Sequence, residues 1–176
     1  MPKASSPRES QLPKLIFFAI AALVLVSDQL TKLWVRSALN LGESIPEAGF
    51  FRIKYLHNTG AAFGLFEDTT LILAIVNLIG AVVILYLIFN ISRFPILADR
   101  KVQFSLSLIL GGTLGNLMDR LFLGYVTDFI AVGGWPPFNI ADSAVVSGSL
   151  LLGLSLILRS LSKEDTDDKE AKTNRR

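Results

Sequence analysis

The chain has 176 residues, of which 51% are hydrophobic, and its mean hydropathy is +0.51. Its formal net charge of +2 gives no indication of a nucleic-acid-binding protein. It has no cysteine and one histidine, which excludes disulfides, a cysteine nucleophile, thiolate metal sites and zinc held by several histidines. No glycine-rich nucleotide-binding motif is present, so we expect neither a cofactor nor a metal.

The apolar residues are gathered in four long blocks, each suited to a membrane-spanning helix. Such a helix needs about 20 mostly apolar residues to cross the hydrocarbon core, and residues 15–35, 70–91, 102–123 and 140–158 meet this requirement. The first block would also suit a cleaved signal peptide, but no small-residue cleavage site follows it closely. The sequence therefore predicts an all-α membrane protein with four transmembrane helices.

The connections between these spans carry further structural signals. Residues 50–56, in the long first connection, partly alternate and are rich in β-forming side chains, so we expect a small extracytoplasmic β-containing region between the first two helices. In the connection 124–139, two prolines end any preceding helix and leave the next to begin near Asn139. We expect one domain over residues 1–161, followed by a charged, disordered cytoplasmic tail over residues 162–176.

The distribution of lysine and arginine predicts the orientation of the chain. Most of these 17 residues lie at the two termini or in the second connection, at Lys3, Arg8, Lys14, Arg93, Arg100, Lys101, Arg159, Lys163, Lys169, Lys172, Arg175 and Arg176. Because positive residues collect on the cytoplasmic side, we expect both termini to be cytoplasmic. The connections 36–69 and 124–139 then face the extracytoplasmic side.

Two aspartates stand at the predicted outer ends of the third and fourth spans. Asp128 follows the third span and Asp142 begins the fourth, so we expect both at a similar depth. Each also has a structural explanation, Asp128 as a solvated loop residue and Asp142 as part of a capping box with Asn139. As a pair, with no other nucleophile evident, they are candidates for acid–base catalysis by two carboxyl groups.

Other polar residues in the spans mark either function or a structural network. Asp28 and Lys32 are four residues apart, which favours an ion pair within one helix. Asn116, Asp119 and Arg120 share one face of the third span, where they would hold neighbouring helices together or contribute to a site.

Glycines and a turn complete the set of singled-out features. Gly111, Gly112 and Gly115 form a small-residue face, which we interpret as a place where another helix packs closely. The sequence Asn58-Thr59-Gly60 predicts a turn with a left-handed glycine. His57 is expected to be a solvated or packed histidine rather than a catalyst.

Five short motifs follow one another along the chain. They are Asp28-Gln29-Leu30-Thr31-Lys32, Asn58-Thr59-Gly60-Ala61-Ala62-Phe63, Gly115-Asn116-Leu117-Met118-Asp119-Arg120, Val126-Thr127-Asp128-Phe129 and Phe138-Asn139-Ile140-Ala141-Asp142-Ser143. Together they resemble the motifs of the bacterial lipoprotein signal peptidase family, or signal peptidase II, in the same order and from the first span to the fourth.

The resemblance implies an aspartic membrane endopeptidase that removes the signal peptide from prolipoproteins, cutting before a cysteine that carries a diacylglyceryl group. It implies Asp128 and Asp142 as the catalytic pair. By the same resemblance Asn58, Gly60, Asn116, Arg120 and Asn139 would shape the site or hold substrate or inhibitor, and Asp28, Lys32 and Asp119 would be structural polar residues. We further expect a monomeric, multi-pass protein of the bacterial cell (inner) membrane, with its active site at the extracytoplasmic face.

Two other classes of protein fit parts of the pattern. A transporter or proton-coupled channel would use the charged residues as an ion path, but these residues crowd toward the predicted outer third of the spans instead of crossing the membrane. A structural assembly protein would use the glycine face for helix association. A presenilin-type protease is disfavoured because no G-x-G-D lies in a span, and a serine–lysine peptidase because no outer serine has an evident lysine partner.

Overall fold

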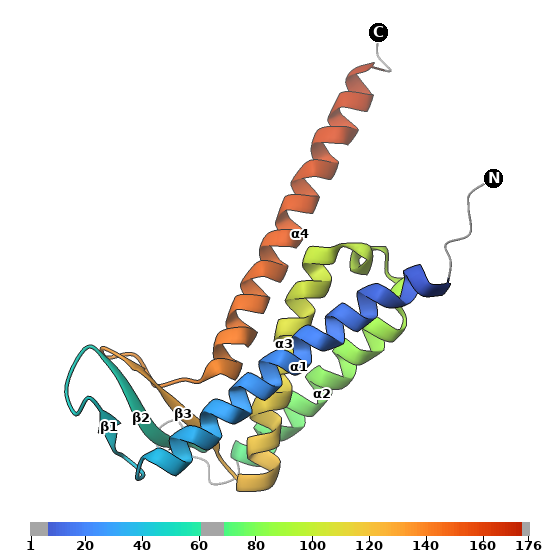
Figure 1. Cartoon of the computed structure of the whole chain (residues 1–176). Helices are drawn as coiled ribbons and strands as arrows, with labels where there is room; N and C mark the ends of the chain where they lie inside the picture. Colours follow the sequence, from blue (N-terminus) through green and yellow to red (C-terminus); the bar gives the residue numbers. More distant parts are fainter. Residues whose placement is uncertain (1–6, 61–68, 174–176) are drawn as a thin grey trace.

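The computed structural model describes the backbone of residues 7–60 and 69–173, and the side chains of residues 14–60 and 70–162. Its four long helices are α1 (Pro7–Ala38), α2 (Thr69–Phe89), α3 (Arg100–Leu123) and α4 (Ile140–Thr173). Each contains a segment long and apolar enough to cross a membrane, which confirms the prediction of four spans. In Figure 1 the helices α1, α2 and α3 lie together, α4 packs along α3 and continues past it, and the start of α1 and the end of α4 lie at the end opposite the sheet.

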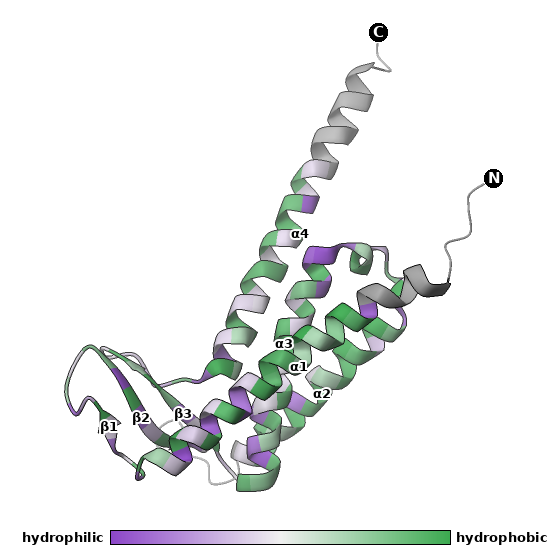
Figure 2. Cartoon of the chain, in the orientation of Figure 1, coloured by the Kyte–Doolittle hydropathy of each residue, from purple (hydrophilic) through white to green (hydrophobic). Residues whose placement is uncertain are grey.

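Helix α2 shows most clearly why this bundle belongs in lipid. It has the highest hydropathy of the four spans, 2.9. Its outward side chains are large, apolar and about half exposed or more, as at Leu71, Ile72, Val76, Ile79 and Val82. Figure 2 shows the same apolar character along the neighbouring helices. A surface of this kind would associate in water, whereas hydrocarbon accepts it without cost.

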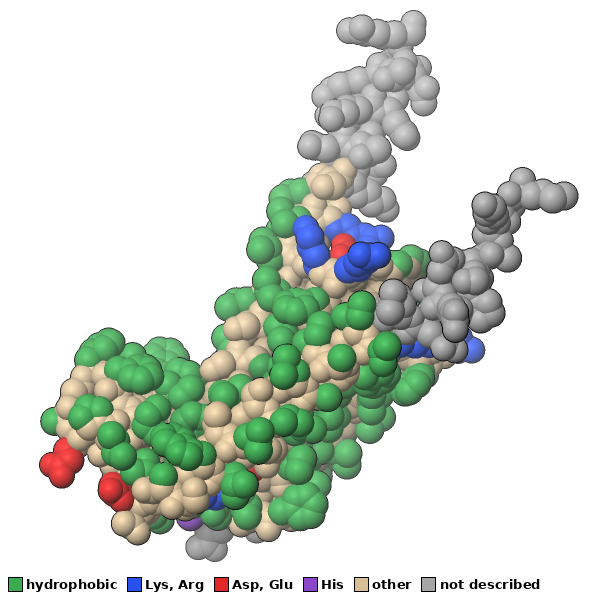
Figure 3. Space-filling view, viewed as in Figure 1, with side chains coloured by type: hydrophobic (Ala, Val, Ile, Leu, Met, Phe, Trp, Pro, Cys, Tyr) green, Lys and Arg blue, Asp and Glu red, His purple; other side chains and the backbone are tan. Residues whose placement is uncertain are grey.

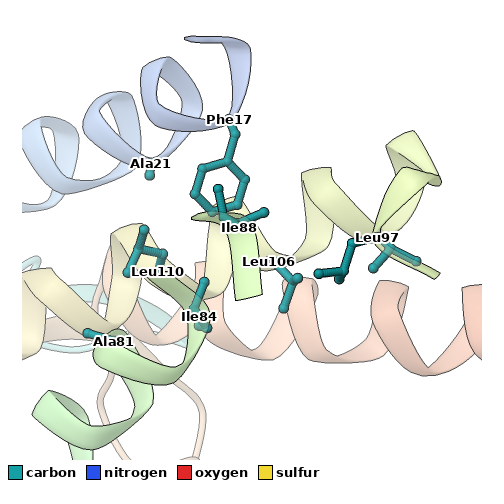
Figure 4. Packing of buried hydrophobic residues seen from close by; sticks show 9 residues of the cluster. Phe17, Ala21, Ala81, Ile84, Ile88, Leu97, Leu106 and Leu110 are labelled. Atoms are coloured by element: carbon teal, nitrogen blue, oxygen red, sulfur yellow. The ribbon is translucent and has the colours of Figure 1, made fainter. Parts of the chain in front are cut away.

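A buried apolar cluster joins the first three helices at the end near the termini (Figure 4). Phe17 of α1 and Leu110 of α3 pack here with Ile84 and Ile88 of α2. Leu97 closes the cluster from a short 3-10 turn, η3 (Pro95–Ala98), which follows η2 (Ile91–Arg93) in the connection between α2 and α3. The helices are therefore held together by side-chain packing at this end and by polar contacts at the other.

The glycines of α3 allow helices to approach it on two sides. A Cβ on Gly111 would lie 2.6 Å from the carbonyl oxygen of Ala21 in α1. One on Gly112 would overlap the backbone of Ala141 in α4, and one on Gly115 would lie 3.3 Å from the Ala141 side chain. The interpretation of these glycines as a packing face is confirmed, and α3 is the central helix.

A three-stranded antiparallel sheet lies at the other end of the bundle, in the order β1 (Ser44–Ile45), β2 (Phe51–Asn58) and β3 (Val126–Val132). The strand predicted in residues 50–56 is confirmed as part of β2. The β-containing region predicted between the first two helices is present as β1 and β2, and a third strand that the sequence did not predict, β3, joins it from the connection between α3 and α4. The pairing of β2 with β3 sets Leu56 opposite Asp128.

Helix α4 continues to Thr173, whereas the sequence predicted disorder from residue 162. The extension contains lysine, glutamate and alanine, which have good helix propensity. A helix that already begins in the bundle also avoids the cost of nucleation. Polar composition alone therefore did not stop the helix at the end of its apolar segment.

Candidate active site

The two singled-out aspartates come from different kinds of local structure. Asp128 lies in the middle of β3 and is only 3% exposed. Asp142 lies in the first turn of α4 and is half-buried. The alternative interpretation of Asp128 as a solvated loop residue is wrong, because β3 is buried on both faces around it.

Asn139 binds both carboxylates and so joins the strand residue to the helix residue. Its Nδ2 donates to Asp128 Oδ1 at 2.8 Å, and its backbone N–H donates to Asp142 Oδ2 at 3.2 Å. The Asp142 backbone N–H in turn donates to Asn139 Oδ1 at 2.9 Å, which confirms the predicted capping box. One asparagine thus caps α4 and fixes the two aspartates side by side.

Each carboxylate is also held by a second asparagine. Asn116 Nδ2, from α3, donates to Asp142 Oδ1 at 2.7 Å. Asn58 Nδ2, from the end of β2, donates to Asp128 Oδ2 at 2.8 Å. Both aspartates are therefore oriented by neutral amide donors, which fix a carboxyl group without neutralising its charge.

The turn that follows β2 determines which end of the Asn58 amide faces Asp128. The Gly60 backbone N–H donates to Asn58 Oδ1 at 2.8 Å, so the amino group is left to point at the carboxylate. Gly60 has a φ of 77°, which confirms the predicted left-handed glycine. The rest of this motif, residues 61–63, lies outside the described residues.

The environment of Asp128 favours its protonated form. Burial raises the pKa of Asp128 from its ordinary 3.8 to about 6, and the neighbouring Asp142 charge also raises it. The hydrogen bonds from Asn58 and Asn139, and the positive charge of Lys32, lower this pKa in part. A carboxyl group with such a pKa can hold or release a proton near neutral pH.

A buried ionic network lies behind the aspartate pair. Lys32 Nζ is 2.8 Å from Asp28 Oδ2 and 3.2 Å from Asp119 Oδ2, and all three side chains are at most 1% exposed. The predicted Asp28–Lys32 ion pair is present. The same ammonium also donates to Asn116 Oδ1 at 2.9 Å. Because an ammonium can only donate, this contact turns the Asn116 amino group toward Asp142.

The network also holds the two elements that carry the aspartates. Asp28 Oδ1 accepts from the Ala141 backbone N–H at 2.9 Å, at the start of α4. Asp119 Oδ2 accepts from the Thr127 backbone N–H at 2.9 Å, next to Asp128 in β3. Both backbone groups are buried and need an acceptor. The network therefore sets the position of strand β3 and of helix α4 from α1 and α3.

Two residues in this region, Gln29 and Arg36, were assigned no role by the sequence analysis. Gln29 donates to Asp119 Oδ1 at 3.2 Å and to the Gly115 carbonyl oxygen at 3.0 Å. Arg36 donates to Thr127 Oγ1 at 3.0 Å and lies 3.7 Å from Asp119 Oδ1. The signal for Arg36 was its position four residues after Lys32, on the same face of α1.

Arg120 lies on α3 within electrostatic range of Asp128, Asp142 and Asp119. Its Nε is buried and has no hydrogen-bond partner, and it forms no ion pair among the residues that the structure describes. The site therefore presents a guanidinium beside the aspartate pair that is not used to hold the fold together.

His57 is a packed residue, as expected. Its ring stacks on Tyr125 with a 3.5 Å separation of the ring centroids, and its Nε2 lies 2.9 Å from Tyr55 Oη. Burial lowers the pKa of His57. Within the described part of the chain, no group of three or more His, Asp or Glu side chains is arranged to hold a metal ion.

Comparisons with known proteins point to one family. A family model described as signal peptidase (SPase) II matches residues 20–158. A lipoprotein signal peptidase of Dehalococcoides mccartyi is 43% identical over 154 residues, which cover 88% of this chain and 96% of the relative. One from Moorella thermoacetica is 44% identical over 145 residues, covering 81% and 93%.

Solved structures show the same fold. A bacterial membrane enzyme determined by the in meso method at 2.3 Å resolution superimposes with a TM-score of 0.69 and 30% sequence identity. The match covers 93% of this chain and 96% of the solved chain. A second bacterial membrane enzyme structure, at 1.9 Å resolution, gives a TM-score of 0.67 over 89% of this chain, also at 30% identity.

Proposed function

Because the chain belongs to the signal peptidase II family, and so is a membrane enzyme that processes the signal peptides of lipoproteins, we propose that Asp128 and Asp142 are its catalytic pair. The transporter and assembly-protein hypotheses are dropped with the family assignment. The observation that carries the proposal is the shared hydrogen-bond partner of the two carboxylates, Asn139, at the polar end of the bundle.

The two carboxyl groups share one proton and divide the chemistry between them. The Asp142 carboxylate accepts from N–H groups at the start of α4 and on Asn116, which stabilise its ionised form. Asp128 is the more buried of the two, and burial raises its pKa to about 6, so this carboxyl group takes up a proton closer to neutral pH than an ordinary aspartate does. Asp142 then takes a proton from a water molecule, whose oxygen attacks the scissile carbonyl carbon, while Asp128 donates a hydrogen bond to the carbonyl oxygen. The C–N bond breaks as its nitrogen is protonated with the help of Asp128, and the amine leaves.

The substrate follows from where this pair lies. The site is at the sheet end of the spans, beside exposed apolar residues such as Trp34 and Trp135, which suit the membrane interface. A prolipoprotein can approach sideways through lipid, with the diacylglyceryl chains of its cysteine in the bilayer and the peptide bond before that cysteine at the water surface. We propose that Asn58, Gly60 and Arg120 bind this substrate.

The proposal extends to location and assembly. The concentration of lysine and arginine near the termini places that end in the cytoplasm and the aspartate pair at the extracytoplasmic face of the bacterial inner membrane. The site is complete within one chain, since β2, β3, α3 and α4 all contribute to it. We therefore propose that the enzyme acts as a monomer.

The test is cleavage of a synthetic diacylglyceryl-modified prolipoprotein by purified protein, with the unmodified precursor as a parallel substrate. Asp128→Asn and Asp142→Asn should each lower kcat at least about 100-fold, the scale of a lost acid or base, while keeping the parent's thermal stability. Asp99→Asn, at the start of α3 on the opposite end of the bundle, is the matched control and should cleave normally. Substantial cleavage by either site variant would refute the catalytic pair, and equal cleavage of the unmodified precursor would refute the lipid requirement.

A further inference from the structure

A groove of about 430 Å³ opens between α3 and α4 near the chain termini, at the opposite end of the bundle from the aspartate pair. Its walls are mostly apolar, and its mouth is basic. The residues that define it are Phe104, Leu151, Leu154 and Leu158 on the walls, with Arg100 and Lys101 at the mouth.

The groove lies beside a close contact between α3 and α4. A Cβ on Gly148 would lie 2.7 Å from the carbonyl oxygen of Ser105 in α3, so the helices touch there. The wall residues Leu151, Leu154 and Leu158 follow Gly148 along α4 toward the charged end of the bundle. Figure 1 shows α4 continuing past the start of α3 at this end.

The basic residues at the mouth are free to bind an external anion. Arg100 and Lys101 are exposed and form no ion pair with any described side chain. The neighbouring Asp99, whose Oδ1 accepts from the Lys101 backbone N–H at 2.7 Å as the cap of α3, adds one negative charge beside these two positive ones. Arg159 stands one turn beyond Ser155, on the wall side of α4. Figure 3 shows lysine and arginine side chains gathered at this end.

We propose that this groove binds one phospholipid with an anionic headgroup, its acyl chain between α3 and α4 and its phosphate at Arg100 and Lys101. A basic pocket between spans beside a charged membrane surface is the chemistry that recognises such lipids. The long apolar walls select a lipid over a free phosphate ion. This site is separate from the aspartate pair, and the proposal does not depend on the catalytic mechanism.

The test uses the fluorescence quenching of a tryptophan by brominated acyl chains. Phe104→Trp places the reporter on the groove wall, at a side chain that is 44% exposed. Val82→Trp, on the lipid-facing side of α2, is the matched control at 55% exposure. The parent protein, whose Trp34 and Trp135 lie at the sheet end, supplies the background signal. Each protein is reconstituted with increasing brominated phosphatidylglycerol or brominated phosphatidylcholine.

The groove reporter should be quenched at a mole fraction of brominated phosphatidylglycerol about 25-fold below that of brominated phosphatidylcholine, since each of the two cations contributes about fivefold near a membrane surface. The α2 reporter should show no preference. Adding Arg100→Gln and Lys101→Gln to the groove reporter should reduce the preference to less than about threefold. Adding Arg93→Gln, which removes an exposed cation that does not line the groove, should leave it unchanged.

Four results would overturn the site. The first is equal quenching of the groove reporter by both lipids, and the second is no quenching by either, which would mean that the chain's own extension or a second copy fills the groove. The third is an equal loss of preference in the Arg93→Gln control, which would indicate general surface charge. The fourth is displacement of the lipid by millimolar inorganic phosphate, which would indicate a site for free anions.

Discussion

Replacing Lys32 by methionine tests the buried network most directly. Four charged side chains make up this network, Asp28, Asp119, Lys32 and Arg36, so its formal charge is balanced. Lys32→Met keeps a similar apolar length but leaves one net negative charge among buried groups. Removing one partner of a buried ion pair costs about 3–5 kcal/mol. For a chain of this size, that corresponds to a fall in Tm of roughly 6–20 °C.

The double variant Lys32→Met/Asp28→Asn restores the charge balance and keeps an oxygen that can accept from the start of α4. It should recover at least half of the lost stability, although it contains more substitutions. Lys54→Met, in β2 outside the network, is the matched control and should stay within about 0.5 kcal/mol of the parent. Thermal unfolding in detergent, followed by circular dichroism, gives the Tm of the single variant, the double variant and the control variant for comparison with the parent. Either of two results would show that charge balance does not stabilise the sheet end of the bundle. One is a Lys32→Met variant that melts within about 2 °C of the parent, and the other is a double variant that is less stable than the single one.

Three further predictions concern the site and the packing of α3. Asn116→Asp should lower kcat at least about 100-fold, because the new carboxylate takes the place of the amide that donates to Asp142 and repels that aspartate; an unchanged kcat would contradict this. Asn58→Ala removes a hydrogen bond that lowers the pKa of Asp128, so that pKa rises above about 6 and the alkaline limb of the kcat/KM profile should move to higher pH; an acid limb that moves to higher pH while the alkaline limb stays in place would reverse the assigned roles. Gly148→Ala should destabilise the folded protein by about 1–3 kcal/mol, because the added methyl group overpacks the contact with α3. Gly153→Ala, with open space around it, should be neutral or slightly stabilising. Equal effects of the two substitutions in thermal unfolding would show that α3 and α4 do not touch at Gly148.

Features set by local sequence were predictable. The four spans follow from apolar length, and the Asn139–Asp142 capping box follows from residue types three positions apart. The Asp28–Lys32 pair follows from the helical repeat. These features need only one helix to be correct, and the spacing of side chains on a helix is fixed.

Features that depend on two distant segments were not predictable in the same way. Strand β3 pairs with β2 across about 70 residues, and its β-forming side chains are interrupted by Asp128, so the segment was expected to be a connection. Lys32 was expected to pair within α1, but it also contacts Asp119 and Asn116 of α3. Such contacts depend on how helices rotate against each other, which a single sequence does not give.

The use of a strand and a helix start to present the two aspartates would let the proposed catalytic pair hold carboxyl groups with different tasks. A residue in a doubly buried strand such as Asp128 loses hydration, which favours its neutral form. Asp142, in the first turn of α4, accepts a hydrogen bond from the Asn139 backbone N–H, at the helix end where the dipole suits a negative charge. Asn139 keeps the two groups together through its backbone and its side chain at once. The difference between the two carboxyl groups comes from the backbone position of each aspartate. Replacing the side chains around them should therefore change the rate of cleavage but leave the proposed roles of Asp128 and Asp142 as they are.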